Sequence, residues 1–504
     1  MGFISLGCPK NLVDSEVMMG LLDRAGARLT DRPEDAEILV VNTCSFIDSA
    51  KQESVDTILE MARHKTEGRA TKLIVAGCLV ERYRDEIRKN IPEVDAVVGT
   101  GELESILEAA GIARQPVRPS PFNILTSSAV ADLRSGKETL AGTHVHEHTA
   151  FRAEGDLREQ QGRFRRDDWQ GAAHMLPTYL YDETTPRLLA TGRTSAYIKI
   201  AEGCDHPCTF CVIPNLRGKF RSRRFESVIA EAQQLVARGV QEITLIGQDT
   251  TCYGEDLGIK DGLAQLLDAL AGIEGLRWLR FLYAYPNRIT GRLLETIAKH
   301  DNICKYLDVP LQHASPSVLK TMKRGAGAEI FLKTLDKVRS AVPGIALRTS
   351  FIVGFPGESL RDLEVLERFI KDAQFDWLGV FTYSHEEGSA AYSLDGQLGK
   401  RTIEARKRRL MKLQQGISKR AKQQWVGREL TVLVEGESEE TPLLWEARTE
   451  FHAPEIDARS TSMTSVISRL SKRAASIVPR LPRRTTMMWS RGLSRQRSKR
   501  MAYV

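Results

Sequence analysis

The chain has 504 residues, of which 42% are hydrophobic, and is expected to form about three soluble domains. No apolar run comes near the roughly eighteen residues of a membrane span, so we expect neither a signal peptide nor a membrane anchor. Eight cysteines without a secretory signal indicate a reducing compartment, so we expect a cytoplasmic protein whose thiolates are free to bind metals. The net charge of +7 comes from the end of the chain, because twelve Lys and Arg lie beyond Asp457. Residues 1–457 carry 60 basic against 65 acidic side chains. This balance suits a basic protein substrate better than a nucleic-acid backbone.

Residues 1–110 alternate short apolar runs with amphipathic stretches of helix length. The runs cover residues 2–6, 36–41, 72–76 and 95–98, and the amphipathic stretches cover residues 14–25, 48–64, 81–90 and 102–110. Apolar runs interleaved with helices predict a parallel sheet covered on both faces, so we expect a doubly wound α/β domain. In a sheet of this kind, ligands bind at the carboxyl ends of the strands.

Three cysteines lie at these strand ends. Cys8 follows the first strand, Cys44 the second and Cys78 the third, and each precedes a helix. Unrelated buried cysteines are common singly, but one cysteine in the equivalent loop of three units favours a shared ligand. The N-terminus of a helix also favours thiolate over thiol, which suits iron ligation.

Residues 111–192 interrupt this order with Pro, Ser, Gly, His and scattered charges. The lack of sustained periodicity predicts a linker with partial disorder. The string His144-Val-His-Glu-His148 could bind a metal at strand spacing, but no other ligand cluster lies nearby in the sequence. We therefore interpret it as an exposed loop.

From Thr194 the alternation of strands and helices returns. Apolar runs cover residues 196–200, 242–246, 278–283, 306–309, 345–353 and 378–383, and helices are expected at 226–238, 261–271, 290–299, 315–322, 359–373 and 402–424. Six strands with intervening helices predict a partial TIM-like barrel over residues 193–424, with its active site at the carboxyl ends of the strands.

A cysteine loop follows the first strand of this expected barrel. Cys204, Cys208 and Cys211 stand at CxxxCxxC spacing, and three thiolates in one loop can hold three irons of a four-iron cluster. The fourth iron stays open, so that a small molecule can chelate it and accept an electron. A structural zinc loop is the alternative, but zinc requires four ligands and no partnering pair lies just downstream.

The string from Gly203 to Arg223, with Phe210 before the last cysteine, resembles the radical S-adenosylmethionine (SAM) superfamily and, within it, the methylthiotransferases. The strings 6–16, 42–47 and 76–79 are similar to the three motifs by which this family binds an auxiliary four-iron cluster. The resemblance therefore implies SAM and two [4Fe-4S] clusters. Their ligands would be Cys204, Cys208 and Cys211 for one cluster and Cys8, Cys44 and Cys78 for the other.

The form Cys8-Pro-Lys-Asn11 resembles the RimO branch of these enzymes, which modifies a ribosomal protein, rather than the branch that modifies tRNA. The resemblance implies transfer of a methylthio group to the β-carbon of an aspartate in the small-subunit ribosomal protein S-twelve. Removing hydrogen from such an unactivated carbon requires radical chemistry, which the cofactor supplies. A sulfur source and an electron donor such as flavodoxin or ferredoxin are implied as partners.

Three later strand ends carry further strings of the family, at residues 247–249, 310–313 and 353–358. By resemblance, the first lies near the amino and carboxylate groups of SAM and the other two near its ribose and adenine. The residues expected to contact SAM are Gly247, Gln248, Asp249, Gln312, His313, Gly354 and Glu358. The string 381–388 is expected to line the cavity, whereas Cys252 and Cys304 fit no cluster motif and are interpreted as ordinary thiols.

Residues 425–457 resemble the start of the family's last domain, a TRAM β-barrel, because the runs 429–434 and 443–448 alternate as strands. Such a barrel needs about five strands to close. After Asp457 the resemblance stops, and residues 458–504 contain no strand alternation and no acidic residue. Either this is a disordered basic tail or the reading frame has shifted, and the abrupt break favours a shift that leaves the barrel incomplete.

Two other functions remain open. The same chemistry could act on a modified adenosine in tRNA, or the chain could be a non-catalytic iron–sulfur electron carrier or scaffold. Cleavage of SAM would exclude the carrier, and the acidic balance of residues 1–457 argues against tRNA.

Overall fold

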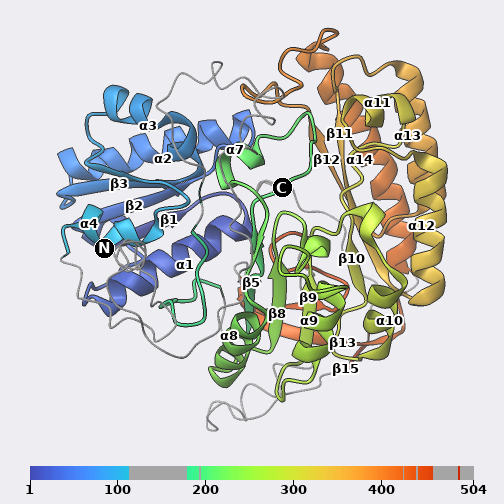
Figure 1. The fold of residues 1–504 in the computed structure, drawn as a ribbon, viewed down its shortest axis with the longest axis horizontal. Helices are drawn as coiled ribbons and strands as arrows, with labels where there is room; N and C mark the ends of the chain where they lie inside the picture. Colours follow the sequence, from blue (N-terminus) through green and yellow to red (C-terminus); the bar gives the residue numbers. More distant parts are fainter. Residues whose placement is uncertain are drawn as a thin grey trace, which may run out of the picture.

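The computed structural model describes residues 1–112, 177, 179–191, 194–423, 425–438, 441–457 and 486–488. The string 144–148 and most of the tail after Asp457 lie outside these residues. No helix within these ranges is both long and apolar enough to cross a bilayer. An N-terminal α/β domain and a larger barrel lie side by side (Figure 1).

The N-terminal domain is built on a parallel sheet with the strand order β1-β2-β3-β4. Val40 and Ile74 pack in one hydrophobic cluster with α1 and α4, and Leu39 and Leu73 pack in another with α2 and α3, so both faces are covered as predicted. The elements in chain order are β1 (Gly2–Ser5), α1 (Pro9–Arg24), η1 (Pro33–Asp35), β2 (Ile38–Thr43), α2 (Asp48–Thr66), β3 (Lys72–Gly77), α3 (Cys78–Asn90), β4 (Ala96–Val98), η2 (Leu103–Ser105) and α4 (Ile106–Ala110).

The strand order corrects the doubly wound prediction. It runs in one direction from β1 to β4, without the reversal that defines a doubly wound sheet. Helix α1 nevertheless covers the face opposite to α2 and α3 (Figure 1). Hydrophobic periodicity shows that a strand is buried on both sides, but it does not specify which strand becomes its neighbour.

Helix α1 is buried on nearly every side, because it packs against both the N-terminal sheet and strand β5 of the barrel. Its apolar side contacts the sheet through Val13 and Val17, which are fully buried. Its polar side is buried as well, since Asn11, Asp14 and Glu16 are at most 2% exposed. Buried polar and charged groups require partners, and the barrel supplies them.

The barrel consists of two parallel sheets of three strands each, β5-β8-β9 and β10-β11-β12. A parallel bridge between Leu279 and Ile303 joins the sheets, so that the six predicted strands follow one another in order. The predicted boundaries agree with the observed ones to within two residues. The strands are β5 (Ser195–Lys199), β8 (Glu242–Ile246), β9 (Trp278–Phe281), β10 (Tyr306–Asp308), β11 (Ala346–Val353) and β12 (Trp377–Thr382).

Helices alternate with these strands along the chain. They are α8 (Phe225–Ala237), η5 (Thr250–Cys252), α9 (Gly262–Ala271), η6 (Pro286–Arg288), α10 (Gly291–Lys299), α11 (Pro316–Thr321), α12 (Ala328–Ala341), α13 (Leu360–Ala373) and α14 (Lys400–Gln423). Helix α12 was not predicted. It buries a narrow stripe formed by Phe331, Leu335 and Val338, and it follows Gly325 and Gly327, which resemble a loop in the sequence.

A loop between β5 and α8 carries the predicted cysteine motif. The short strand β6 (Ala201–Glu202) pairs antiparallel with β7 (Arg221–Ser222), and the loop between them contains α7 (Ile213–Arg217). This pairing fixes the loop at the carboxyl end of β5.

Residues 448–457, which we call the floor segment, close the opposite end of the barrel. Arg448 forms a buried ion pair with Glu242, the first residue of β8. Asp457 accepts a hydrogen bond of 2.7 Å from Tyr306, the first residue of β10. Because both partners begin barrel strands, the floor segment lies across the amino ends of the strands.

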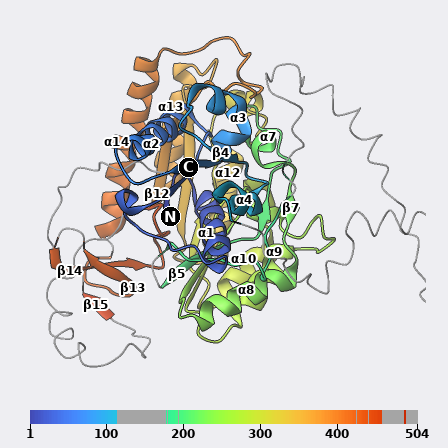
Figure 2. The same ribbon diagram turned by 90° about the vertical axis from the view of Figure 1, so that its left-hand side faces the viewer.

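The predicted C-terminal barrel is observed as a sheet of three strands in the described part of the chain. β13 (Glu429–Ser438) pairs antiparallel with β14 (Thr441–Thr449) and with β15 (Thr486–Met488). Figure 2 shows this sheet to one side of the large barrel. The strand β15 within residues 458–504 was not predicted, and the TRAM assignment stays a prediction.

Part of the predicted linker is packed against the two domains. Tyr181 is 2% exposed and donates a hydrogen bond to Glu231 of α8. Arg187 forms ion pairs with Glu16 of α1 at 2.5 Å and with Glu231 at 2.6 Å. Residues 179–191 therefore connect α1 to the barrel.

Candidate functional site

Six cysteines from the two domains line one cavity. Each domain contributes three, from loops at the carboxyl ends of its parallel strands, where the sequence placed them. We call them the N-terminal trio (Cys8, Cys44 and Cys78) and the barrel trio (Cys204, Cys208 and Cys211). A single space is therefore bordered by two sets of three sulfur ligands.

A glycine and two helix ends bring the N-terminal trio together. Gly7 has a φ of +91°, and a β-carbon on it would lie 2.8 Å from the β-carbon of Cys44, so only glycine allows the loops of Cys8 and Cys44 to approach this closely. Cys8 caps α1 and Cys78 begins α3, so both lie at the positive end of a helix dipole.

Burial shifts the pKa of two thiols in this trio. Burial raises the pKa of Cys44 far above its ordinary value, and the neighbouring thiols of Cys78 and Cys8 raise it further. Burial also raises the pKa of Cys78 to about 11, although the Arg217 guanidinium acts to lower it. Buried thiols of this kind lose their protons when a metal cation takes the place of the protons. Three cysteine sulfurs on a cavity wall fit an iron–sulfur cluster with one open iron.

The barrel trio lies in the loop between β6 and β7. Gly203 has a φ of +80°, and a β-carbon there would lie 2.0 Å from the carbonyl oxygen of Lys219, so the loop can close only at a glycine. The Cys211 amide donates a hydrogen bond of 3.2 Å to the Cys208 carbonyl. Burial raises the pKa of Cys204 to about 12, and the nearby Cys208 raises it further. Three thiols of one short loop on the cavity wall fit an iron–sulfur cluster with one open iron.

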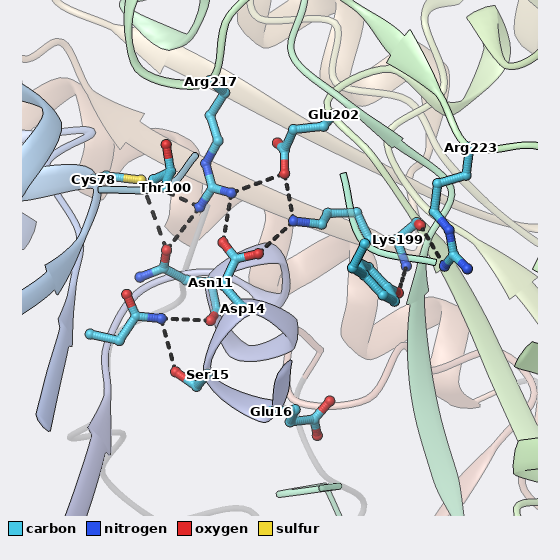
Figure 3. A network of polar contacts seen from close by, with 12 residues as sticks. Asn11, Asp14, Ser15, Glu16, Cys78, Thr100, Lys199, Glu202, Arg217 and Arg223 are labelled. Atoms are coloured by element: carbon cyan, nitrogen blue, oxygen red, sulfur yellow. Dashed lines mark hydrogen bonds and ion pairs between the residues drawn. The ribbon is translucent and has the colours of Figure 1, made fainter. Parts of the chain in front are cut away.

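A buried ionic network joins the two domains beside the trios (Figure 3). Arg217, at the end of α7, contacts the carboxylates of Asp14 at 2.7 Å and Glu202 at 3.1 Å. Lys199, at the end of β5, contacts the same two carboxylates at 2.5 Å each. All four side chains are at most 5% exposed. Because Asp14 belongs to α1, the network fixes this helix to the barrel.

Arg217 also reaches the N-terminal trio (Figure 3). Its Nη2 lies 3.4 Å from the Cys78 sulfur and 2.8 Å from Asn11 Oδ1. A guanidinium from the loop of the barrel trio therefore contacts a sulfur of the other trio. Burial acts to lower the pKa of Arg217, but Cys78, Glu202 and Asp14 hold it well above its ordinary value, so the group stays charged.

A second ionic contact joins the domains through Glu386. This residue belongs to the string 381–388, which lines the cavity as predicted. Glu386 is 1% exposed and accepts hydrogen bonds from Arg82 of α3 at 2.8 Å and from Lys51 of α2 at 2.9 Å. Both sides of the N-terminal sheet are thus tied to the barrel by buried charges.

The seven predicted SAM contacts separate into two groups. Gln248, Asp249 and Gln312 line the cavity. The remaining four do not line it, namely Gly247, His313, Gly354 and Glu358. Gln248 donates a hydrogen bond of 2.7 Å to Glu202, which joins the strand end after β8 to the loop of the barrel trio.

The second group holds the backbone of the strand ends. Glu358 is 2% exposed and accepts hydrogen bonds from the Gly354 amide at 2.5 Å and from Arg406 of α14 at 2.6 Å. His313 is fully buried, and its Nδ1 accepts a hydrogen bond of 3.0 Å from the Ser315 amide. Burial lowers the pKa of His313 to about 4, so its imidazole is neutral.

Three cavity residues were missed as functional candidates. Arg324 lies 3.7 Å from the Cys208 sulfur and over the ring of Tyr285, which stacks on His206 with ring centroids 3.9 Å apart. No motif in the sequence surrounds Arg324 or Tyr285. Lys10 stands in the string Cys8-Pro-Lys-Asn11, and that string was the one available signal.

Known protein families match both domains that contribute to this cavity. Residues 1–99 match the model of an uncharacterised protein family, UPF0004, and residues 198–370 match that of the radical SAM superfamily. A relative from Koribacter versatilis named ribosomal protein uS12 methylthiotransferase RimO is 65% identical over 461 residues, which cover 91% of this chain and 89% of the relative. A relative of the same name from Solibacter usitatus is 55% identical over 459 residues, which cover 91% and 87%.

Among solved structures, the radical SAM methyltransferase TsrM from Kitasatospora setae is similar at a TM-score of 0.46. The sequence identity is 17%, and the match covers 74% of this chain and 70% of that protein. This likeness is too remote to bear on the site.

The barrel, its cysteine loop and the family match define a radical SAM enzyme with an additional cysteine-bearing domain at its N-terminus. The cofactors of such an enzyme here are SAM and two [4Fe-4S] clusters, which the two trios of the cavity fit in number and in donor type. The chain belongs to the RimO family of methylthiotransferases.

The Glu386 contact can be tested by its effect on stability. The change Glu386→Gln leaves Arg82 buried without its countercharge, so we expect the free energy of unfolding to fall by about 3 to 5 kcal/mol. Urea denaturation of the iron-free protein measures this. Glu387→Gln makes the same change at the exposed neighbouring residue and should have little effect. Equal losses in the two variants would contradict the role of Glu386.

Proposed function

We propose that this chain transfers a methylthio group to the β-carbon of an aspartate in ribosomal protein uS12. The observation that carries the proposal is that two cysteine trios from two domains open into one cavity. A reaction that first removes hydrogen from a carbon and then adds sulfur to it requires two cofactor sites that reach the same atom. The relatives named for uS12 support the choice of substrate.

In this proposal the barrel trio holds the cluster at which SAM is cleaved, and the N-terminal trio holds the auxiliary cluster that carries the sulfur. When bound, these groups supply a radical that removes hydrogen and a sulfur that replaces it, which no side chain can supply. The protein positions them. Gln248, Asp249 and Gln312 contact SAM from the cavity wall, and the second group holds the strand ends in place.

Further parts of the proposal concern the rest of the chain and its partners. We assign residues 425–457 to the start of a TRAM-type barrel, which the antiparallel pair β13 and β14 supports. A flavodoxin or ferredoxin is the expected electron donor, a separate sulfur source is required, and the reaction takes place in the cytoplasm. The change of composition after Asp457 is attributed to a shifted reading frame.

Modification of tRNA is the competing activity, and a mass measurement separates the two. We expect uS12 to gain the mass of one methylthio group when it is incubated with the reconstituted enzyme, SAM, sulfide and a reductant. Transfer RNA in a parallel incubation should stay unchanged, because residues 1–457 carry more acidic than basic side chains. A gain on tRNA alone would replace the proposed substrate.

The assignment of the two trios predicts different losses in two single variants. Cys204→Ala should abolish the release of deoxyadenosine from SAM, whereas Cys78→Ala should retain this release and stop methylthio transfer. Iron analysis should show that each variant has lost about half of the iron of the wild type, since each lacks one of two equal clusters. Cys304→Ala is the matched control, because Cys304 is buried outside the cavity. Methylthiolated product from Cys78→Ala would contradict the assignment of the auxiliary cluster to the N-terminal trio.

The contact of Arg217 with Cys78 predicts a shift in reduction potential. Hydrogen bonds to a cluster sulfur stabilise the reduced cluster, so Arg217→Lys, which keeps the charge but loses the planar fork, should make the potential of the auxiliary cluster more negative. A redox titration followed by electron paramagnetic resonance measures this in protein whose barrel trio is changed to alanine.

The control for this titration is Arg221→Lys. Arg221 lies in the same loop and donates hydrogen bonds to backbone carbonyls of Lys219 and Arg217. An unchanged potential in Arg217→Lys, or the same shift in both variants, would mean that the guanidinium does not tune the cluster.

A further inference from the structure

Lys10 is a buried lysine with an incomplete set of partners. Its side chain lines the cavity and is 8% exposed. An ammonium group has three donors. The described residues offer it one acceptor, the Gly247 carbonyl oxygen at the long distance of 3.4 Å. The ring of Tyr283 lies 3.7 Å from the ammonium, which satisfies one side of the charge.

Lys199 provides a comparison within the same protein. It is also buried, at 3% exposed, and it contacts two carboxylates, those of Asp14 and Glu202, at 2.5 Å each. Lys10 forms no ion pair with any residue that the structure describes. A buried cation with no carboxylate in direct contact is costly, and a bound anionic group would complete the partners of Lys10.

The other cations on the cavity wall are already engaged. Arg217 contacts Asp14 and Glu202. Arg348 contacts Asp308 at 2.7 Å and Asp457 of the floor segment at 3.3 Å. Arg324 donates to the carbonyl of Pro310 and lies beside the barrel trio. Lys10 is therefore the cavity cation, among the described residues, that stands beside the N-terminal trio without a carboxylate.

Lys10 also stands where the two domains meet. It is on α1, two residues after Cys8, and its ammonium contacts the barrel at Gly247, just after β8, and at Tyr283, just after β9. An atom that reacts at both trios must lie in the cavity that Lys10 lines together with them.

We propose that Lys10 binds the side-chain carboxylate of the aspartate that is modified. In aspartate the β-carbon bears the carboxylate directly, so a substrate placed with this carbon between the trios brings its carboxylate to the same place. An ammonium and a carboxylate form a charge-assisted hydrogen bond, which is strong in a site that excludes water. The inference rests on the proposed function and adds to it the group that selects an acidic residue over a neutral one.

The test combines a change in the enzyme with a change in the substrate. Binding of uS12 to the reconstituted enzyme with SAM is measured for the wild type and for Lys10→Met, with uS12 carrying either the acceptor aspartate or asparagine in its place. We expect Lys10→Met to weaken binding of the aspartate protein at least about tenfold, the usual value of a charge-assisted hydrogen bond. Binding of the asparagine protein should be the same for both enzymes.

Three further measurements distinguish substrate binding from support of the cofactors. Iron content, affinity for SAM and release of deoxyadenosine without substrate should be unchanged in Lys10→Met, and Lys10→Arg should recover part of the lost binding. Lys219→Met is the matched control, because Lys219 is an exposed lysine that does not line the cavity, and it should behave as the wild type.

Several outcomes would overturn the inference. An equal loss of binding for the aspartate and asparagine proteins would show that Lys10 does not contact the carboxylate. A fall in iron content would assign the ammonium to the thiolates, and a fall in SAM affinity would assign it to the cofactor. A wild-type enzyme that leaves uS12 unmodified would instead refute the proposed function, and the inference with it.

Discussion

The buried ionic network of Arg217, Lys199, Asp14 and Glu202 is the constraint on which the site depends. Two domains with three cysteines each form one reaction centre only if they are held in a fixed orientation. Apolar contact between α1 and the barrel is non-directional, whereas charge-assisted hydrogen bonds between opposed groups require one geometry. Desolvation of the four buried charges offsets much of their mutual attraction, so the network adds little to the net free energy of unfolding.

Most of the secondary structure could be predicted from the sequence, because the runs that form β5, β8 and β11 are apolar and separated by amphipathic helices. The order of the N-terminal sheet could not be predicted, since periodicity describes a strand's burial and leaves its neighbour open. The same limit applies to the polar face of α1. Asp14 resembles an ordinary exposed residue until a lysine 185 residues away is placed against it.

The site shows a similar division. All six cysteines could be placed near strand ends, because Cys44 and Cys78 directly follow buried strands and the other four stand in loops that come soon after a strand. The SAM contacts at the later strand ends, in residues 247–249, 310–313 and 353–358, were harder to predict. A sequence motif indicates a turn there, but it does not show which side chains of the turn face the cavity. Gln312 faces the cavity and its neighbour His313 is buried in the wall behind it. The role of Lys10 could not be predicted for a further reason, because residues of both domains surround its side chain.

The floor segment has a practical consequence for any shortened version of this enzyme. Asp457 lies at the end of that segment, and its carboxylate is a counterion of Arg348, whose side chain also borders the reaction chamber. A chain cut at the end of α14, where the barrel helices finish, would therefore lose a counterion of the cavity residue Arg348 together with the floor segment. A shortened enzyme that keeps the ion pairs of the floor segment must extend through residue 457. The hairpin of β13 and β14 must then be kept as well, because it connects α14 to the floor segment.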